Sequence, residues 1–153
     1  MVDWMMEVLH VFKCENETIF LAILIMDLYL NKVKIPTTKE NLHLIGTTSI
    51  YMASKFEDIT PISVSHVVNK ISHGKFKPKQ VVEIERNIFS TIEYNVILAS
   101  PYEFIKTYIY DFLHNNERKI NKLQMKNHVN NLEGASIYMA KLMCHNDSFS
   151  QYK

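Results

Sequence analysis

Residues 41–54 carry no charged side chain apart from a possible charge on His43. A helix without charge on any side is normally buried by its neighbours. Small residues are interspersed in this segment, and they let adjacent helix axes approach closely. We therefore expect the segment to form the central helix of an all-α bundle. Its apolar residues recur at helical spacing and are Leu42, Leu44, Ile45, Ile50, Met52 and, beyond the segment, Phe56.

Apolar residues at helical spacing also predict helices on both sides of this central segment. Asn16, Thr38 and Pro78 are typical of helix starts. The chain has only 3 Gly and 4 Pro, too few for the frequent turns of a sandwich or barrel. The expected helices are residues 2–12, 16–30, 38–58, 63–71 and 78–92. The sequence thus predicts a five-helix unit within residues 1–95.

The C-terminal third predicts the beginning of a second unit, residues 96–153. Pro101 starts an expected helix that runs through Phe112, and another helix is expected from about Leu132 to Cys144. Residues 114–127 are polar and rich in Asn and Lys, which favours a surface connection. Because two helices alone cannot bury their apolar faces, we expect this second unit to be incomplete.

The charge balance weighs against nucleic-acid and membrane partners. The chain has 17 basic and 16 acidic residues, and only two of the basic residues are arginines. Such a balance creates no strong field toward nucleic acid or anionic lipid. The longest apolar run, residues 19–26, is far shorter than the roughly 20 residues of a membrane span. With no signal peptide visible, we expect a soluble protein of the nucleus or cytoplasm.

Neither a catalytic site nor a metal site is apparent in the sequence. Cys14 and Cys144 are far apart, which predicts two buried thiols in a reducing compartment. His10 and Cys14 share one helix face, but two ligands alone do not make a zinc site. No Gly-rich loop precedes a helix, and no nucleophile lies on a strained turn. We therefore expect no enzyme activity, metal or cofactor, and a function in recognition.

Several segments resemble the cyclin box, in the order and with the gaps of that family. One such segment would be weak evidence, but a series of them over nearly the whole chain is strong. The matching segments are residues 2–4 with Glu7, 42–46 (Leu-His-Leu-Ile-Gly), 53–57 (Ala-Ser-Lys-Phe-Glu), 80–85, 100–105 and 136–153. Residues 2–4 and 53–56 are similar to mitotic cyclins. Cys14-Glu15 and the spacing between Tyr94 and Pro101 resemble D-type cyclins.

The resemblance implies a regulatory subunit that binds and activates a cyclin-dependent protein kinase. By the same resemblance, Lys55 and Glu85 form a pair that faces the kinase. The alternative is an ordinary surface ion pair, which contributes only about 0–1 kcal/mol. The apolar part of the kinase-facing surface is expected from Phe56, Met52, Phe89, Tyr94 and Val96; plain core packing is the alternative for each.

The resemblance also implies a groove that docks substrates or inhibitors containing an Arg-x-Leu motif. Its apolar floor would accept the Leu side chain, and an acidic rim would suit the cation. The expected floor residues are Met1, Trp4, Leu42 and Ile71, and the expected rim residues are Glu7 and His43. The alternative is that the Trp and Leu side chains belong to the core.

Departures from the family pattern limit what the resemblance implies. Asp27 aligns with an aspartate whose usual arginine partner is missing, and Leu28 replaces the family's following Arg. A buried carboxylate without its partner is costly, so we expect a fragment that lacks part of the first helix and the last helices of the second repeat. Two alternative functions are a cyclin-fold adaptor and a TFIIB-like transcription factor, neither of which activates a kinase. A helical enzyme is a third.

Overall fold

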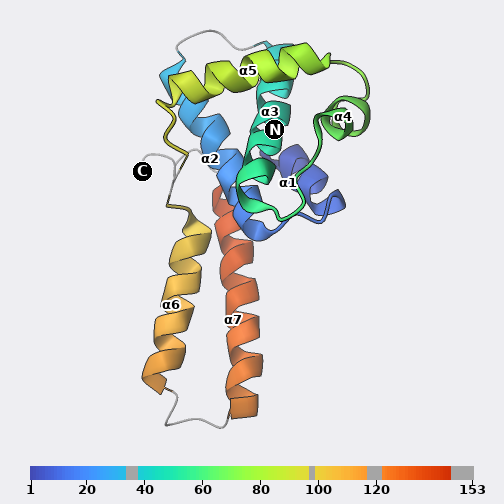
Figure 1. The fold of residues 1–153 in the computed structure, drawn as a ribbon. Coiled ribbons are helices and arrows are strands. Elements are labelled where there is room, and N and C mark those ends of the chain that lie inside the picture. Colours follow the sequence, from blue (N-terminus) through green and yellow to red (C-terminus); the bar gives the residue numbers. More distant parts are fainter. Residues whose placement is uncertain (34–37, 97–98, 117–121, 146–153) are drawn as a thin grey trace. The chain divides into compact units, whose positions relative to one another are not determined.

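The computed structural model describes residues 1–33, 38–96, 99–116 and 122–145 (Figure 1). Within these ranges the regular structure is helical and no strand occurs, which confirms the all-α prediction. The chain separates into unit one (Met1–Leu98) and unit two (Ala99–Lys153), which are described separately. The helices are α1 (Val2–Val11), α2 (Asn16–Lys32), α3 (Lys39–Glu57), α4 (Val64–His66), the π-helical turn η1 (Val67–Ile71), α5 (Pro78–Thr91), α6 (Pro101–Asn116) and α7 (Lys122–Met143).

Helix α3 is the centre of unit one, as the uncharged segment predicted. It contacts α1, α2, α5 and η1, and every residue from 45 to 54 except Tyr51 is buried. Its start follows the expected signal, because the Thr38 hydroxyl accepts a hydrogen bond from the backbone N–H of Asn41 at 3.2 Å. Its two ends, residues 39–41 and 55–57, are exposed. The fold thus presents the C-terminal end of α3 to solvent.

Helix α2 packs against α3 with most of its surface buried. Glu15 is its N-cap, so the helix begins at Asn16 rather than being capped by it. Asp27 also differs from the sequence prediction. It is half-buried and takes part in an interaction, so it is not a buried carboxylate without a partner.

The segment predicted as one helix over residues 63–71 contains two kinds of turn. The Ser63 hydroxyl accepts a hydrogen bond from the His66 N–H at 3.3 Å and starts α4. The chain then widens into the π-helical turn η1, where the Ser72 N–H reaches the Val67 carbonyl at 2.9 Å. Helix α5 begins at Pro78, as predicted, and the Gln80 side chain accepts a hydrogen bond from the Lys77 N–H at 2.8 Å.

In unit two, α6 and α7 contact each other. Helix α6 begins at Pro101 as predicted, with a reciprocal pair of hydrogen bonds between Ser100 and Glu103. The predicted surface connection over residues 114–127 is wrong where the structure describes it. Helix α6 extends to Asn116, and α7 begins at Lys122 instead of near Leu132. Residues 122–126 are Lys, Leu, Gln, Met and Lys, all strong helix formers, whether polar or apolar.

Several large apolar side chains of α6 and α7 are exposed, in line with two helices that cannot bury their apolar faces alone. They include Phe104, Tyr108, Leu132, Tyr138 and Met139. Cys14 in unit one and Cys144 in unit two are each half-buried rather than fully buried, and neither is in a disulfide.

Candidate protein-binding surface

Lys55 and Glu85 meet at the exposed end of α3. Lys55 lies in the last turn of α3, and Glu85 lies in the middle of α5, where Val81 and Ile88 anchor the helix in the core. The Lys55 Nζ donates a hydrogen bond to Glu85 Oε1 and forms an ion pair with it. The side chain of Glu85 is 12% exposed and that of Lys55 is 36% exposed. The anion is therefore held in place by the fold, while the cation remains accessible.

The ring of Tyr51 also contacts the ammonium group of Lys55. It precedes Lys55 by one helical turn, and the Lys55 Nζ lies 4.3 Å from the centroid of the Tyr51 ring. A cation over an aromatic face gains about 0.5–2 kcal/mol. Together, Tyr51 and Glu85 orient the ammonium group of Lys55. Tyr51 was not predicted as a site residue, although an aromatic residue four positions before a lysine on one helix indicates such a contact.

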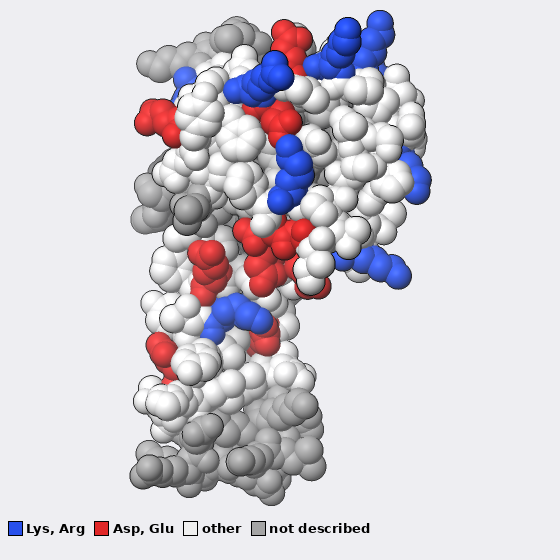
Figure 2. Space-filling model, viewed as in Figure 1, with Lys and Arg blue, Asp and Glu red and all other residues white. Residues whose placement is uncertain are grey.

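Beside this ion pair, Phe56, Phe89 and Tyr94 form a row of rings, called here the aromatic row. The ring centroids of Phe56 and Phe89 are 6.0 Å apart, and those of Phe89 and Tyr94 are 6.4 Å apart. Phe56 is 52% exposed and Tyr94 is 75% exposed, while Phe89 is half-buried. Over α5 and the part of α3 that it crosses, charged patches of both signs adjoin uncharged surface (Figure 2).

Met52 and Val96 were expected on this surface, and the structure places both in the core. Met52 is 0% exposed and Val96 is 6% exposed. Met52 lies in the part of α3 that the neighbouring helices enclose, and every residue from 45 to 54 except Tyr51 is buried there. Of the five apolar residues predicted for this surface, only the three of the aromatic row are accessible to solvent.

A hydrogen-bond network fixes the end of α3. Asp58 follows the helix; its Oδ1 accepts from the Thr18 hydroxyl and its Oδ2 from the Ser54 hydroxyl, both at 2.7 Å. The Ser54 oxygen in turn accepts from the Ile62 N–H at 2.8 Å. Burial and a hydrogen bond to Asp58 raise the pKa of the Cys14 thiol to about 12. The network joins α2, α3 and the loop before α4, so it holds the turn that carries Lys55 and Phe56.

Asp58→Ala should lower the free energy of unfolding by about 2–3 kcal/mol, because the buried hydroxyls of Thr18 and Ser54 lose their acceptor. Thr18→Val removes one donor at nearly constant shape and should cost about 1 kcal/mol. Urea denaturation of both variants and of the double variant measures these changes. A loss below about 0.5 kcal/mol for Asp58→Ala, within the usual range of surface substitutions, contradicts a structural role for the network.

A second cluster lies where α1 meets α3. The rings of Trp4 and His43 meet edge to face with centroids 4.7 Å apart, and His43 lies 5.3 Å from the ring of Phe76. Gly46 allows this approach of the two helices. A Cβ added at Gly46 would lie 3.1 Å from Met1 Sδ and 3.6 Å from Trp4 Cζ3. The structure thus brings together Met1, Trp4 and His43, all of which were predicted to form the groove.

The other predicted groove residues divide into accessible and buried ones. Leu42 is half-buried and Glu7 is exposed. Ile71 is only 4% exposed, because η1 turns it toward α3, so it belongs to the core and not to an accessible floor. Phe76 was not predicted. It follows Gly74 and Lys75 in a turn, where helical periodicity gives no signal.

The charge of His43 depends on its surroundings. Burial is the main cause that lowers the pKa of His43 below its usual 6.5, and the positive charges of Lys75 and His73 lower it further. The imidazole is therefore neutral at pH 7. Glu7 is then the charged group among the residues predicted for the rim of this cluster.

Comparison with protein families decides the identity of the fold. The family model described as the N-terminal domain of cyclins matches residues 1–97. The chain belongs to the cyclin family. The cyclin resemblance of residues 42–46, 53–57 and 80–85 is thereby confirmed, and the cyclin match covers all the helices of unit one.

Individual cyclins show the same relationship at moderate identity. The chain is 39% identical over 108 residues to the G2/mitotic-specific cyclin-B of Dictyostelium discoideum, a match that covers 71% of the chain and 24% of that cyclin. It is 33% identical to mouse cyclin-B3 and 30% identical to Drosophila melanogaster cyclin-A, again over 71% of the chain, covering 8% and 21% of those proteins. The match thus spans at most about a quarter of these cyclins.

The described residues contain neither a candidate membrane span nor a candidate metal-binding cluster. Among the described helices, none combines the length and apolar character needed to cross a membrane. In the same part of the chain, no group of three or more His, Cys, Asp or Glu side chains is arranged to hold a metal ion.

Proposed function

We propose that this cyclin-family chain acts as a non-enzymatic regulatory subunit that binds and activates a cyclin-dependent protein kinase and so controls the cell cycle. The observation that carries the proposal is the Lys55–Glu85 ion pair, which lies beside the aromatic row on a unit that matches the cyclin N-terminal domain. Relatives named as G2/mitotic-specific cyclins support a role in mitosis. A site of action in the nucleus or cytoplasm is part of the same proposal.

The chemistry of Lys55 suits a contact with a second protein. A lysine ammonium group has three N–H donors. One of them is used by Glu85, and the Tyr51 ring covers another side of the group. The remaining donors can reach carboxylate or carbonyl oxygens of a kinase. Because Glu85 and Tyr51 already orient the side chain, little conformational entropy is lost on binding.

The aromatic row supplies the apolar part of the proposed interface. Exposed aromatic side chains are enriched among the residues that dominate binding energy. Phe56 and Tyr94 together expose large apolar surfaces next to an oriented charge. This combination of an apolar anchor with a fixed charge favours one defined partner orientation.

The proposed mechanism is a shift of the kinase between two conformations. A protein kinase is active only when the glutamate of its regulatory helix pairs with the lysine that holds the ATP phosphates. A partner that binds better to the inward position of that helix stabilises the active state. Near-complete switching needs about 5.5 kcal/mol of differential affinity. The Asp58 network supports such a role, because it keeps the binding surface rigid.

A kinase activation assay tests the proposal. The purified 153-residue chain is added to a panel of cyclin-dependent kinase subunits, and phosphate transfer to a substrate peptide is measured. We expect one kinase to bind the chain and to gain activity over the kinase alone. Binding without activation would instead support the adaptor alternative. A DNA gel shift at physiological salt, without kinase binding, would support the TFIIB-like alternative.

We also propose that the cluster of Met1, Trp4, Leu42 and His43, with Glu7 at its edge, docks partner segments that contain Arg-x-Leu. The proposal is supported by the close approach of α1 and α3 at Gly46, which leaves Trp4 half-buried beside neutral His43. A neutral imidazole leaves Glu7 to attract the arginine, and the apolar side chains can contact the leucine.

The affinity for an Arg-x-Leu peptide should fall as the pH decreases from 7.5 to 5.5. Burial lowers the pKa of His43 below its usual 6.5, so the side chain is neutral at pH 7.5 and gains its proton only at a lower pH than an ordinary histidine does. The new positive charge then repels the arginine of the peptide. Fluorescence anisotropy with a labelled peptide measures the effect, and His43→Gln should remove most of it. Equal pH dependence in wild type and His43→Gln contradicts the prediction.

A further inference from the structure

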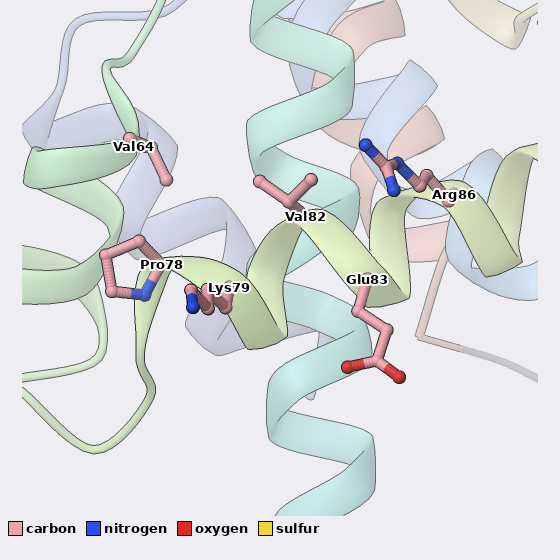
Figure 3. A pocket seen from close by; sticks show the side chains of 6 residues that line it. All are labelled: Val64, Pro78, Lys79, Val82, Glu83 and Arg86. Carbon is pink, nitrogen blue, oxygen red and sulfur yellow. The ribbon is translucent and has the colours of Figure 1, made fainter.

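A pocket between α4 and α5 is separate from both surfaces described above. Its volume is about 620 Å³, and it opens to solvent. Figure 3 shows its lining side chains, which come from α4 and from the first turns of α5. These residues are Val64, Pro78, Lys79, Val82, Glu83 and Arg86. None of them contributes to the Lys55–Glu85 pair, the aromatic row or the Trp4 cluster.

The pocket lies on the outer face of α5. The inner face of α5 is buried through Val81, Glu85 and Ile88. The pocket residues of α5 follow the spacing i, i+3, i+4 and i+7 from Lys79 to Arg86, which places them on one different face. Val64 and Val82 are half-buried and Pro78 is exposed. The pocket therefore has apolar walls that still contact solvent.

Basic residues predominate in the segment that leads into the pocket, although Glu83 also lines the pocket itself. Residues 59–82 contain no Asp or Glu, whereas they contain four lysines, in a chain whose net charge is only +1. All four lysines are exposed, and none forms an ion pair with another described residue. Basic side chains project from the start of α5 in Figure 2. The lysines are Lys70, Lys75, Lys77 and Lys79.

The two basic residues that line the pocket are spaced to hold two carboxylates. Lys79 and Arg86 are seven residues apart on α5, which corresponds to about 10 Å along the helix axis. An extended peptide covers this distance in about three residues. The Arg86 guanidinium can bind a carboxylate through two hydrogen bonds. Glu83 lies between the two cations in the sequence, and in Figure 3 its side chain points to the other side of α5 from Val82 and Arg86. It therefore repels a carboxylate on that side, while the apolar walls beside Val82 favour an aliphatic or aromatic side chain.

We propose that this pocket binds a short acidic peptide segment of a partner protein, whose apolar side chain contacts Val64, Pro78 and Val82 while flanking carboxylates pair with Lys79 and Arg86. Charge complementarity supports an acidic occupant, and the apolar walls support a peptide rather than a nucleic acid. Sites for single-stranded nucleic acid normally offer aromatic rings for stacking bases, and this pocket has none among its lining residues.

Fluorescence anisotropy tests the proposal directly with the 153-residue chain. The probe is a labelled ten-residue peptide in which one Leu lies between two pairs of Glu. Two matched peptides replace the Leu with Ser or all Glu with Gln. We expect the Leu peptide to bind, the Ser peptide to bind at least 5-fold more weakly, and the Gln peptide to bind at least 10-fold more weakly.

Charge-reversal variants locate the binding site. Lys79→Glu and Arg86→Glu change exposed side chains, so both variants should fold, and each should reduce the affinity for the Leu peptide about 10-fold. Lys13→Glu makes the same charge change at an exposed lysine outside the pocket and should change the affinity less than 2-fold. An equal loss in all three variants, or equal binding of the Leu and Ser peptides, would overturn the proposal. Tighter binding of a single-stranded oligonucleotide through Lys79 and Arg86 would also overturn it.

Discussion

Lys55→Ala is expected to weaken kinase binding by about 30- to 1000-fold. Truncating one member of a hydrogen-bonded charge pair at an interface costs roughly 2–4 kcal/mol, because its partner is left buried and unpaired. Here the partner is Glu85 of the same chain, whose side chain is 12% exposed. A docked kinase would cover Glu85 without its cation and would also lose its own contact with the Lys55 ammonium group. Glu85→Ala should have a similar effect, since Lys55 then loses its orientation. Surface plasmon resonance with the immobilised kinase measures both affinities.

Lys32 provides the matched control for this experiment. Lys32 forms a second ion pair in unit one: its Nζ lies 2.8 Å from Glu93 Oε1. The side chains of Lys32 and Glu93 are both well exposed. Lys32→Ala should therefore change kinase affinity less than 3-fold, and the stability of unit one by less than about 1 kcal/mol. If Lys32→Ala and Lys55→Ala weaken binding equally, the assignment of the kinase surface to the Lys55 side is wrong.

Met52→Ala is expected to lower the free energy of unfolding by about 2–5 kcal/mol, the usual cost of deleting a fully buried methionine side chain. Met52 lies in the enclosed part of α3, so the truncation leaves a cavity at the centre of unit one. Urea denaturation followed by circular dichroism measures the loss. The kinase affinity of the remaining folded protein should be unchanged, because Met52 does not reach the surface.

Phe56→Ala is the informative comparison for Met52. Phe56 is 52% exposed, so its truncation should cost less than about 1 kcal/mol of stability. It should weaken kinase binding at least 10-fold if the aromatic row is an anchor. The assignment would be contradicted if Met52→Ala mainly weakened kinase binding and Phe56→Ala mainly lowered the free energy of unfolding.

The central helix was predictable because its signal is local. Fourteen consecutive residues, 41–54, lack Asp, Glu, Lys and Arg, which predicts a helix that its neighbours bury. In the structure, α3 contacts α1, α2, α5 and η1. The start of α7 was not predictable in the same way. Residues 122–127 are polar and resemble a connection, while their helix propensity supports continuous helix. The composition of this segment favoured a connection and its helix propensity favoured a helix; the structure contains a helix.

The candidate site was predictable in its charges and only partly in its apolar residues. The cyclin resemblance pointed to Lys55 and Glu85, which the fold brings into contact. It could not separate Phe56 from Met52, because exposure depends on where the surrounding helices end. The Asp58 network joins residues up to 40 positions apart, so no local pattern contains it.

The contact between Cys14 and Asp58 also affects thiol chemistry in this part of the molecule. Burial first, and then the hydrogen bond to Asp58, raise the pKa of Cys14 to about 12, so very little of the side chain is a thiolate at pH 7. Since the thiolate is the species that peroxide and electrophiles attack, Cys14 should react far more slowly than an ordinary cysteine. The carboxylate that holds the end of α3 thus adds to the protection that burial gives this sulfur against oxidation.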